Sequence, residues 1–173
     1  MTKDTKPRRT TRPNRTGLIW GLGILAFFAV AGSLFFLRAS NAPEAGPMGG
    51  LLYDADIQAT GVAAVAGVEV EGAELAMGQV PNNVTVVPEW TLTNTGDHPI
   101  TFGEPHASVI EGCCPGPLEL TATTLAPGES AQLTFPLQMH PGMDGPHDFD
   151  VHVPIADTSE YLTLRVTGTF GSA

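Results

Sequence analysis

The chain has 173 residues, of which 42% are hydrophobic and only 15% are charged, and its formal net charge is −10. The charge is unevenly divided, because residues 1–38 carry seven of the eight Lys and Arg while residues 39–173 carry 17 of the 18 Asp and Glu. Nucleic-acid binding depends on clustered basic side chains, so the acidic C-terminal part argues against nucleic acid as a partner. The length after residue 50 suits one domain with one hydrophobic core.

An apolar segment follows the basic N-terminus. Residues 17–37 form a run of 21 residues without a charge, and at about 1.5 Å per residue such a helix crosses a hydrocarbon core of roughly 30 Å. We predict a single-pass membrane protein with residues 1–16 as a cytoplasmic basic tail, because basic residues stay on the cytoplasmic side. A cleaved signal peptide is the alternative, although its apolar region is normally about 7–15 residues long.

The segment after the apolar run predicts a linker and then an extracytoplasmic domain. Residues 38–50 are rich in Pro, Gly and Ala and are expected to form a flexible linker. The domain then covers residues 51–173. Its beginning, residues 51–72, has no clean hydrophobic period. This stretch either contains a first edge strand around residues 68–70 or lies against the domain.

From Glu74 onward, apolar stretches alternate with turn sequences such as Asn94–Asp97 and Ala126–Glu129. A spacing of about 8–12 residues between turns is typical of an all-β sandwich. We predict a seven-stranded, antiparallel Ig-like sandwich with Trp90 in its core. The expected strands are residues 75–80, 84–94, 100–110, 118–124, 130–138, 147–153 and 161–170.

The order of these segments resembles a known family of bacterial domains. The similarity is carried by Met77–Val80, Trp90–Ile100, a cysteine pair, Leu125–Ser130 and Leu164–Gly168. Together they are similar to the Ig-like envelope domains of unknown function that are related to Hydin-type and abnormal-spindle-type repeats. The resemblance implies the fold and an envelope location, but no activity. The chain departs from the family because its cysteines are adjacent rather than in a Cys-Gly-Cys arrangement.

Chemically versatile side chains are concentrated in residues 112–115 and 139–147. These segments supply thiolates, thioethers and imidazoles, which are the ligands that Cu(I) prefers. In an Ig-like sandwich the loops after the third and fifth strands leave the same end of the domain. The two segments are therefore expected at one pole, with His98 at the other. The predicted metal ligands are Cys113, Cys114, Met139, His140, Met143 and His147.

Other roles compete for these residues. The adjacent cysteines outside the cytoplasm could form a strained vicinal disulfide, Met139 could fill the core, and His152 could face solvent. No Cys-x-x-Cys, phosphate loop or Gly-x-Ser-x-Gly motif is present, so we do not predict an enzyme. The leading hypothesis is copper binding for storage, sensing or delivery. The alternative is a non-catalytic adhesion or assembly module with structural cysteines and an envelope protein as its partner.

Overall fold

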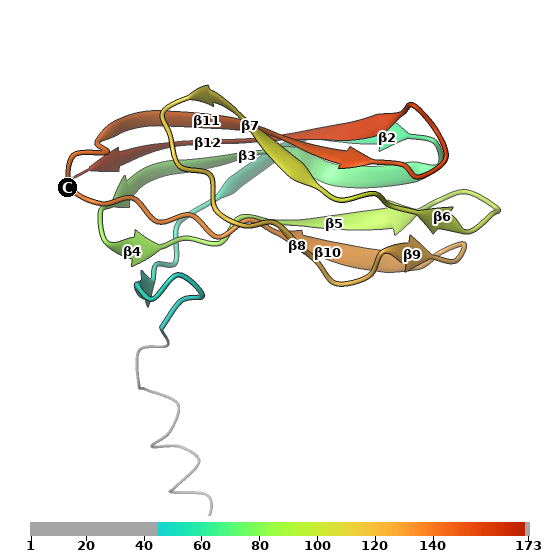
Figure 1. Ribbon diagram of the computed structural model, residues 1–173, viewed down its shortest axis with the longest axis horizontal. Helices are drawn as coiled ribbons and strands as arrows, with labels where there is room; N and C mark the ends of the chain where they lie inside the picture. The colour runs from blue at the N-terminus through green and yellow to red at the C-terminus, as the bar shows by residue number, and fades with distance from the viewer. Residues whose placement is uncertain (1–44, 172–173) are drawn as a thin grey trace, which may run out of the picture. The chain divides into compact units, whose positions relative to one another are not determined.

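The computed structural model describes residues 45–171, which contain strands and turns and no helix (Figure 1). The all-β prediction is therefore confirmed for this part of the chain. The predicted cytoplasmic tail, the transmembrane helix and the first part of the linker lie outside the described residues. Among residues 45–171, no helix is long and apolar enough to span a bilayer.

Twelve strands make up the described part of the chain. In chain order they are β1 (Leu51–Leu52), β2 (Gln58–Val65), β3 (Val68–Pro81), β4 (Val84–Thr85), β5 (Glu89–Asn94), β6 (Ile100–Thr101), β7 (His106–Glu111), β8 (Glu119–Leu120), β9 (Thr124–Leu125), β10 (Ser130–Thr134), β11 (Gly145–Pro154) and β12 (Tyr161–Gly171).

Two layers of strands share the long strand β3. One layer, called the β11 layer, has the order β7-β11-β12-β3, and the other, called the β10 layer, has the order β3-β5-β10-β8. Residues 74–81 of β3 pair with β12, whereas Val68 and Glu69 pair with β5, so β3 passes from one layer to the other. The strand β2 forms a hairpin with β3 and pairs with the edge of β3 that does not face β12 and β5.

The strand boundaries differ from the predicted ones where the chain contains proline. The predicted strand 84–94 is divided near Pro88 into β4 and β5, and the predicted strand 100–110 is divided near Pro105 into β6 and β7. Proline lacks the N–H group that would donate a hydrogen bond to the neighbouring strand, so the strand is interrupted there. The strand β2 was not predicted, because most of its residues are exposed and leave no hydrophobic alternation.

The sandwich is not purely antiparallel, which corrects the predicted topology. The strands β3 and β12 run parallel, as do the short strands β1 and β4. Parallel neighbours require a long crossover connection. Between β3 and β12 this connection contains the strands β4 to β11, so the parallel pairing joins two strands that are far apart in the chain.

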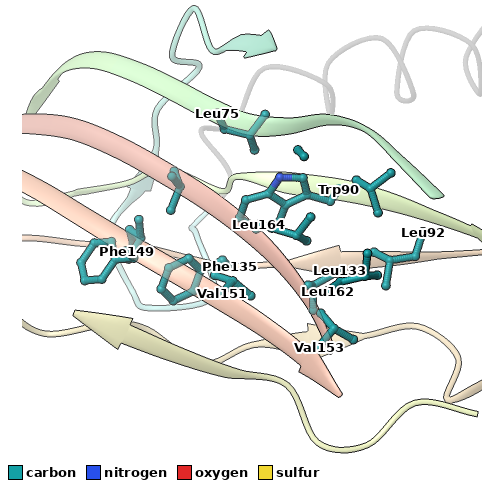
Figure 2. Packing of buried hydrophobic residues seen from close by; sticks show 14 of the residues in the cluster. Leu75, Trp90, Leu92, Leu133, Phe135, Phe149, Val151, Val153, Leu162 and Leu164 are labelled. Atoms are coloured by element: carbon teal, nitrogen blue, oxygen red, sulfur yellow. The ribbon is translucent and has the colours of Figure 1, made fainter. Parts of the chain in front are cut away.

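The hydrophobic core lies between the two layers, and Figure 2 shows its central side chains. Trp90 of β5 is 1% exposed, which confirms its predicted core position, while Phe135 and Phe149 meet edge to face at 5.5 Å. Residues 149, 151 and 153 of β11 are buried, and the residues between them are half-buried on the outer face. This alternation decides which side chains of β11 reach solvent.

Candidate functional site

The two cysteines lie in the loop that connects β7 to β8. Gly112 and Cys114 both have positive φ angles, of 87° and 61°, so the chain turns sharply on either side of Cys113. Cys113 is half-buried and Cys114 is exposed. Both are free thiols, and their Sγ atoms are 2.6 Å apart. The loop therefore presents a pair of converging thiols at the surface.

The close contact changes the acidity of one thiol. The hydrogen bond between the two side chains raises the pKa of the Cys113 thiol, and burial and the charge of a neighbouring Cys114 thiolate raise it further. Once one thiol of a close pair is ionised, the second proton is harder to remove, because it would leave two negative charges side by side. Cys113 therefore stays protonated until the pair meets a strong thiolate-binding partner or a higher pH.

The loop between β10 and β11 is held in place by Asp144. The Asp144 carboxylate accepts hydrogen bonds from Asn82 Nδ2 at 2.8 Å and from the Gly142 N–H at 3.1 Å. Within the loop, the Met143 N–H donates to the His140 carbonyl at 3.0 Å. The His140 ring is exposed, with Nδ1 3.3 Å from Asn83 Oδ1. Asp144 thus fixes a turn that carries one histidine and one methionine.

The two methionines of this segment differ in burial. Met139 is fully buried and belongs to the hydrophobic core, whereas Met143 is half-buried and packs against the edge of the core. A thioether inside a packed core contributes to packing and is not presented to a metal ion. Of the two predicted thioether ligands, Met143 is the one with a solvent-facing side.

His147, the first inward-facing residue of β11, is only 3% exposed. Its Nδ1–H donates to the Gly145 carbonyl at 3.1 Å, and its ring meets Phe170 at 5.1 Å in an edge-to-face contact. The other ring nitrogen, Nε2, is buried and has no hydrogen-bond partner among residues 45–171. Because Nδ1 carries the hydrogen that it donates to Gly145, Nε2 carries a lone pair that can bind a metal ion.

The cysteine loop and the start of β11 meet at the His147 ring. A Cβ atom added to Gly112 would lie 2.5 Å from His147 Cδ2 and 3.0 Å from Nε2. Only glycine can accommodate the ring at this position. The structure therefore brings residues 112 and 147 together at one pole, as the Ig-like topology predicts, whereas His98 lies in the distant loop between β5 and β6 (Figure 1).

The predicted ligands do not form a closed metal site in the described state. In residues 45–171, no group of three or more His, Cys, Asp or Glu side chains is arranged to hold a metal ion. Asp148, next to His147, is occupied by a bidentate ion pair with Arg165, which raises the pKa of Arg165. The Asp148 carboxylate is therefore already neutralised. Of the predicted ligands, all except the core residue Met139 remain available as donors, namely the two thiols, His140, Met143 and His147 Nε2.

A second pair of histidines, which was not predicted to form a site, lies on the outer face of the β11 layer. His106 of β7 and His152 of β11 are directly opposite each other in the antiparallel ladder. Their ring centres are 5.2 Å apart. The register between two strands that are some forty residues apart in the chain creates this pair, and no local sequence pattern signals it.

No protein-family model matches the chain, and no curated protein matches it. Among solved structures, the chain is similar to the secreted serine protease VesC from Vibrio cholerae, with 15% identity and a TM-score of 0.40 over 56% of this chain and 21% of that one. A protein of unknown function from Porphyromonas gingivalis W83 is 16% identical, with a TM-score of 0.47 over 65% of this chain and 49% of that one. PapD-like domain 7 of human CEP192 is 14% identical, with a TM-score of 0.41 over 62% of this chain and 87% of that domain. At these identities the likeness concerns the fold alone.

Proposed function

We propose that this chain is a single-pass membrane protein whose extracytoplasmic Ig-like domain binds Cu(I) at the pole that contains Cys113, Cys114 and His147. The observation that carries the proposal is the buried, unpartnered Nε2 of His147, whose ring lies against Gly112 at the start of the cysteine loop. A buried polar atom without a partner costs about 1–3 kcal/mol. A metal ion bound to Nε2 would recover this cost.

The donors at this pole match the preferences of a soft ion. Two thiolates and an imidazole favour Cu(I), and the half-buried thioether of Met143 is a further soft donor on the neighbouring loop. The described state holds the two sulfur atoms against each other rather than around a metal. Binding therefore requires the turn at Gly112–Pro115 to open toward His147, with the loss of both thiol protons to solvent.

Cu(I) competition against a chromogenic chelator tests the proposal on the reduced domain. We expect one tightly bound Cu(I) per chain, which Cys113→Ser with Cys114→Ser abolishes because thiolates are the strongest donors present. We expect His147→Phe to weaken binding by about tenfold or more, as loss of a metal-orienting or metal-binding group generally does. Met143→Leu should weaken it less.

Two substitutions serve as matched controls. Met139→Leu also removes a thioether, but at a buried position where a volume-conserving change is tolerated. His98→Ala removes an exposed imidazole at the other pole. Both should leave the Cu(I) affinity unchanged. If Met139→Leu weakens binding as much as His147→Phe, or if the double cysteine variant binds like the parent, the proposed copper site is wrong.

The predicted membrane topology requires a separate experiment. If residues 17–37 span the membrane with the basic tail inside, protease added to spheroplasts should degrade the domain and spare the N-terminus. Protection of the domain would contradict this orientation. A soluble mature form that begins near Pro43 would show instead that the apolar segment is a signal peptide.

A second function is favoured by the exposed edge of the β11 layer. Among residues 45–171, β7 pairs only with β11, and Val109 and Ile110 are 42% and 57% exposed at this edge. Exposed apolar residues on a strand at the edge of a sheet can recruit a strand of another protein. This is the adhesion or assembly hypothesis. Replacing Ile110 with Lys should then abolish capture of an envelope protein while leaving Cu(I) binding intact.

A further inference from the structure

The histidine pair on the outer face of the β11 layer has the arrangement of a chelate. His106 and His152 occupy opposite positions on β7 and β11, and their rings are tilted by 40° with centres 5.2 Å apart. His106 is exposed and His152 is half-buried. Both rings therefore reach solvent on the same face of the sheet, away from the core and from His147.

The ring separation agrees with two imidazoles on one metal ion. A tetrahedral Zn²⁺ holds each nitrogen about 2.0–2.1 Å away, and the ring centre lies about 1.1 Å further out, so two rings on one ion have centres about 5.2 Å apart. The observed separation is 5.2 Å. The two histidines can therefore bind one ion by rotation of their side chains, without movement of the strands.

The surroundings of His152 orient its ring. Thr163, opposite His152 on β12, places Oγ1 3.4 Å from Nδ1, and Tyr161 packs edge to face against the ring with centres 5.3 Å apart. A hydrogen bond at Nδ1 leaves Nε2 as the metal-binding nitrogen, which is the usual way in which protein ligands are oriented. His106, His152 and Tyr161 also line a surface hollow of about 290 Å³. This hollow leaves room for water molecules in the remaining coordination positions.

We propose that His106 and His152 chelate a borderline divalent ion of the Zn²⁺ class, in an open site completed by water. Imidazole favours Zn²⁺, Cu²⁺ and Ni²⁺, which distinguishes this site from the softer dithiol pole. The proposal does not depend on copper binding by the cysteine loop, because the two sites share no residue and lie on opposite faces of β11.

Zn²⁺ titration of the Cys113→Ser, Cys114→Ser variant tests this site without interference from the thiols. We expect saturable binding of one Zn²⁺ per chain. In this double serine background, His106→Ala and His152→Ala should each lower the association constant for Zn²⁺ by at least about tenfold. His98→Ala and His140→Ala should leave the association constant within about twofold of that of the double serine variant. Circular dichroism of each variant checks that the fold is retained.

Ring resonances from NMR provide a second readout that does not depend on a substitution. Substoichiometric Zn²⁺ should shift the signals of His106 and His152 together and leave those of His98 and His140 in place. The proposal is overturned if the parent shows no saturable binding, if the two single variants bind like the parent, or if Zn²⁺ shifts His140 instead. Each of these outcomes leaves the Cu(I) result at the other site unaffected.

Discussion

Two histidines on the same strand illustrate how differently the two faces of β11 use one side chain. His147 points inward, is 3% exposed and has one buried nitrogen without a partner. His152, five residues later, points outward and faces His106 across the ladder. Because side chains alternate along a strand, an odd separation places the two rings on opposite faces. The inner histidine carries the cost of burying an unpartnered nitrogen, whereas the outer one is only half-buried.

This difference separates residues whose side chains contribute to the packed core from residues whose side chains face outward from the sheet. On the inner face, Trp90 is 1% exposed, and the His147 ring lies so close to Gly112 that an added Cβ would be 2.5 Å from it. On the outer face, His106 and His152 are supported only by neighbours on the same sheet. Substitutions on the inner face should therefore lower stability, and at His147 they should also weaken the proposed Cu(I) binding, whereas substitutions on the outer face should alter metal binding with little change in stability.

The largest expected effect is at the centre of the inner face. Trp90→Ala should lower the free energy of unfolding by about 3–5 kcal/mol, because it leaves a large cavity in the core. Denaturant unfolding of the domain measures this loss. A loss below about 0.5 kcal/mol would place the indole outside the packed core and would remove the distinction between the two faces.

Gly112→Ala should be the next most damaging change. Its Cβ would meet the buried His147 ring at 2.5 Å, whereas Gly128→Ala has a similar positive φ of 81° and open space around the added atom. We expect Gly112→Ala to cost about 1–3 kcal/mol more than Gly128→Ala, as overpacking generally does.

A double-mutant cycle identifies the atoms responsible for this excess. In a His147→Ala background the ring is absent, so the extra cost of Gly112→Ala should disappear. Chemical unfolding of the four proteins in the cycle measures the coupling. Equal costs in both backgrounds would show that backbone strain, and not contact with the ring, determines the effect at residue 112.

The two histidines of β11 can be compared directly. His147→Ala should lower stability by about 1–2 kcal/mol, because lost packing against Phe170 is partly offset by removal of the unpartnered nitrogen. His152→Ala should change it by less than about 0.5 kcal/mol, as expected for an outer-face residue. Thermal and denaturant unfolding test both variants. The reverse order of losses would show that the faces of β11 are assigned incorrectly.

The smallest expected effect concerns the cysteine loop. Cys114→Ala removes the hydrogen bond and the neighbouring charge that raise the pKa of Cys113. The pKa of Cys113 should therefore fall toward its ordinary value, and alkylation by iodoacetamide at pH 8 should become faster, because the thiolate is the reactive form. Site-resolved mass spectrometry follows the rate at Cys113. A slower reaction in the variant would show that the contact between the two thiols does not control acidity.

Much of the fold follows from local patterns in the sequence. The alternation in the last predicted strand, residues 161–170, gives β12 nearly its observed length, and the predicted strand 147–153 lies within β11. The burial of Trp90 follows from its position in an apolar strand. These features depend on neighbours along the chain. The strand β2 was missed because an exposed strand has no strong hydrophobic period. The breaks at Pro88 and Pro105 were missed because a proline inside an apolar segment does not change the hydrophobic pattern of that segment.

The sequence by itself determined the β-rich composition of the domain, its turns and the two segments that carry sulfur and imidazole. Only the tertiary structure decided that Met139 is part of the core, that the His147 ring lies against Gly112 and that His106 faces His152. The physical reason is that alternation is a local property of one strand. A contact between strands depends instead on their register, which is fixed by the packing of the whole sandwich.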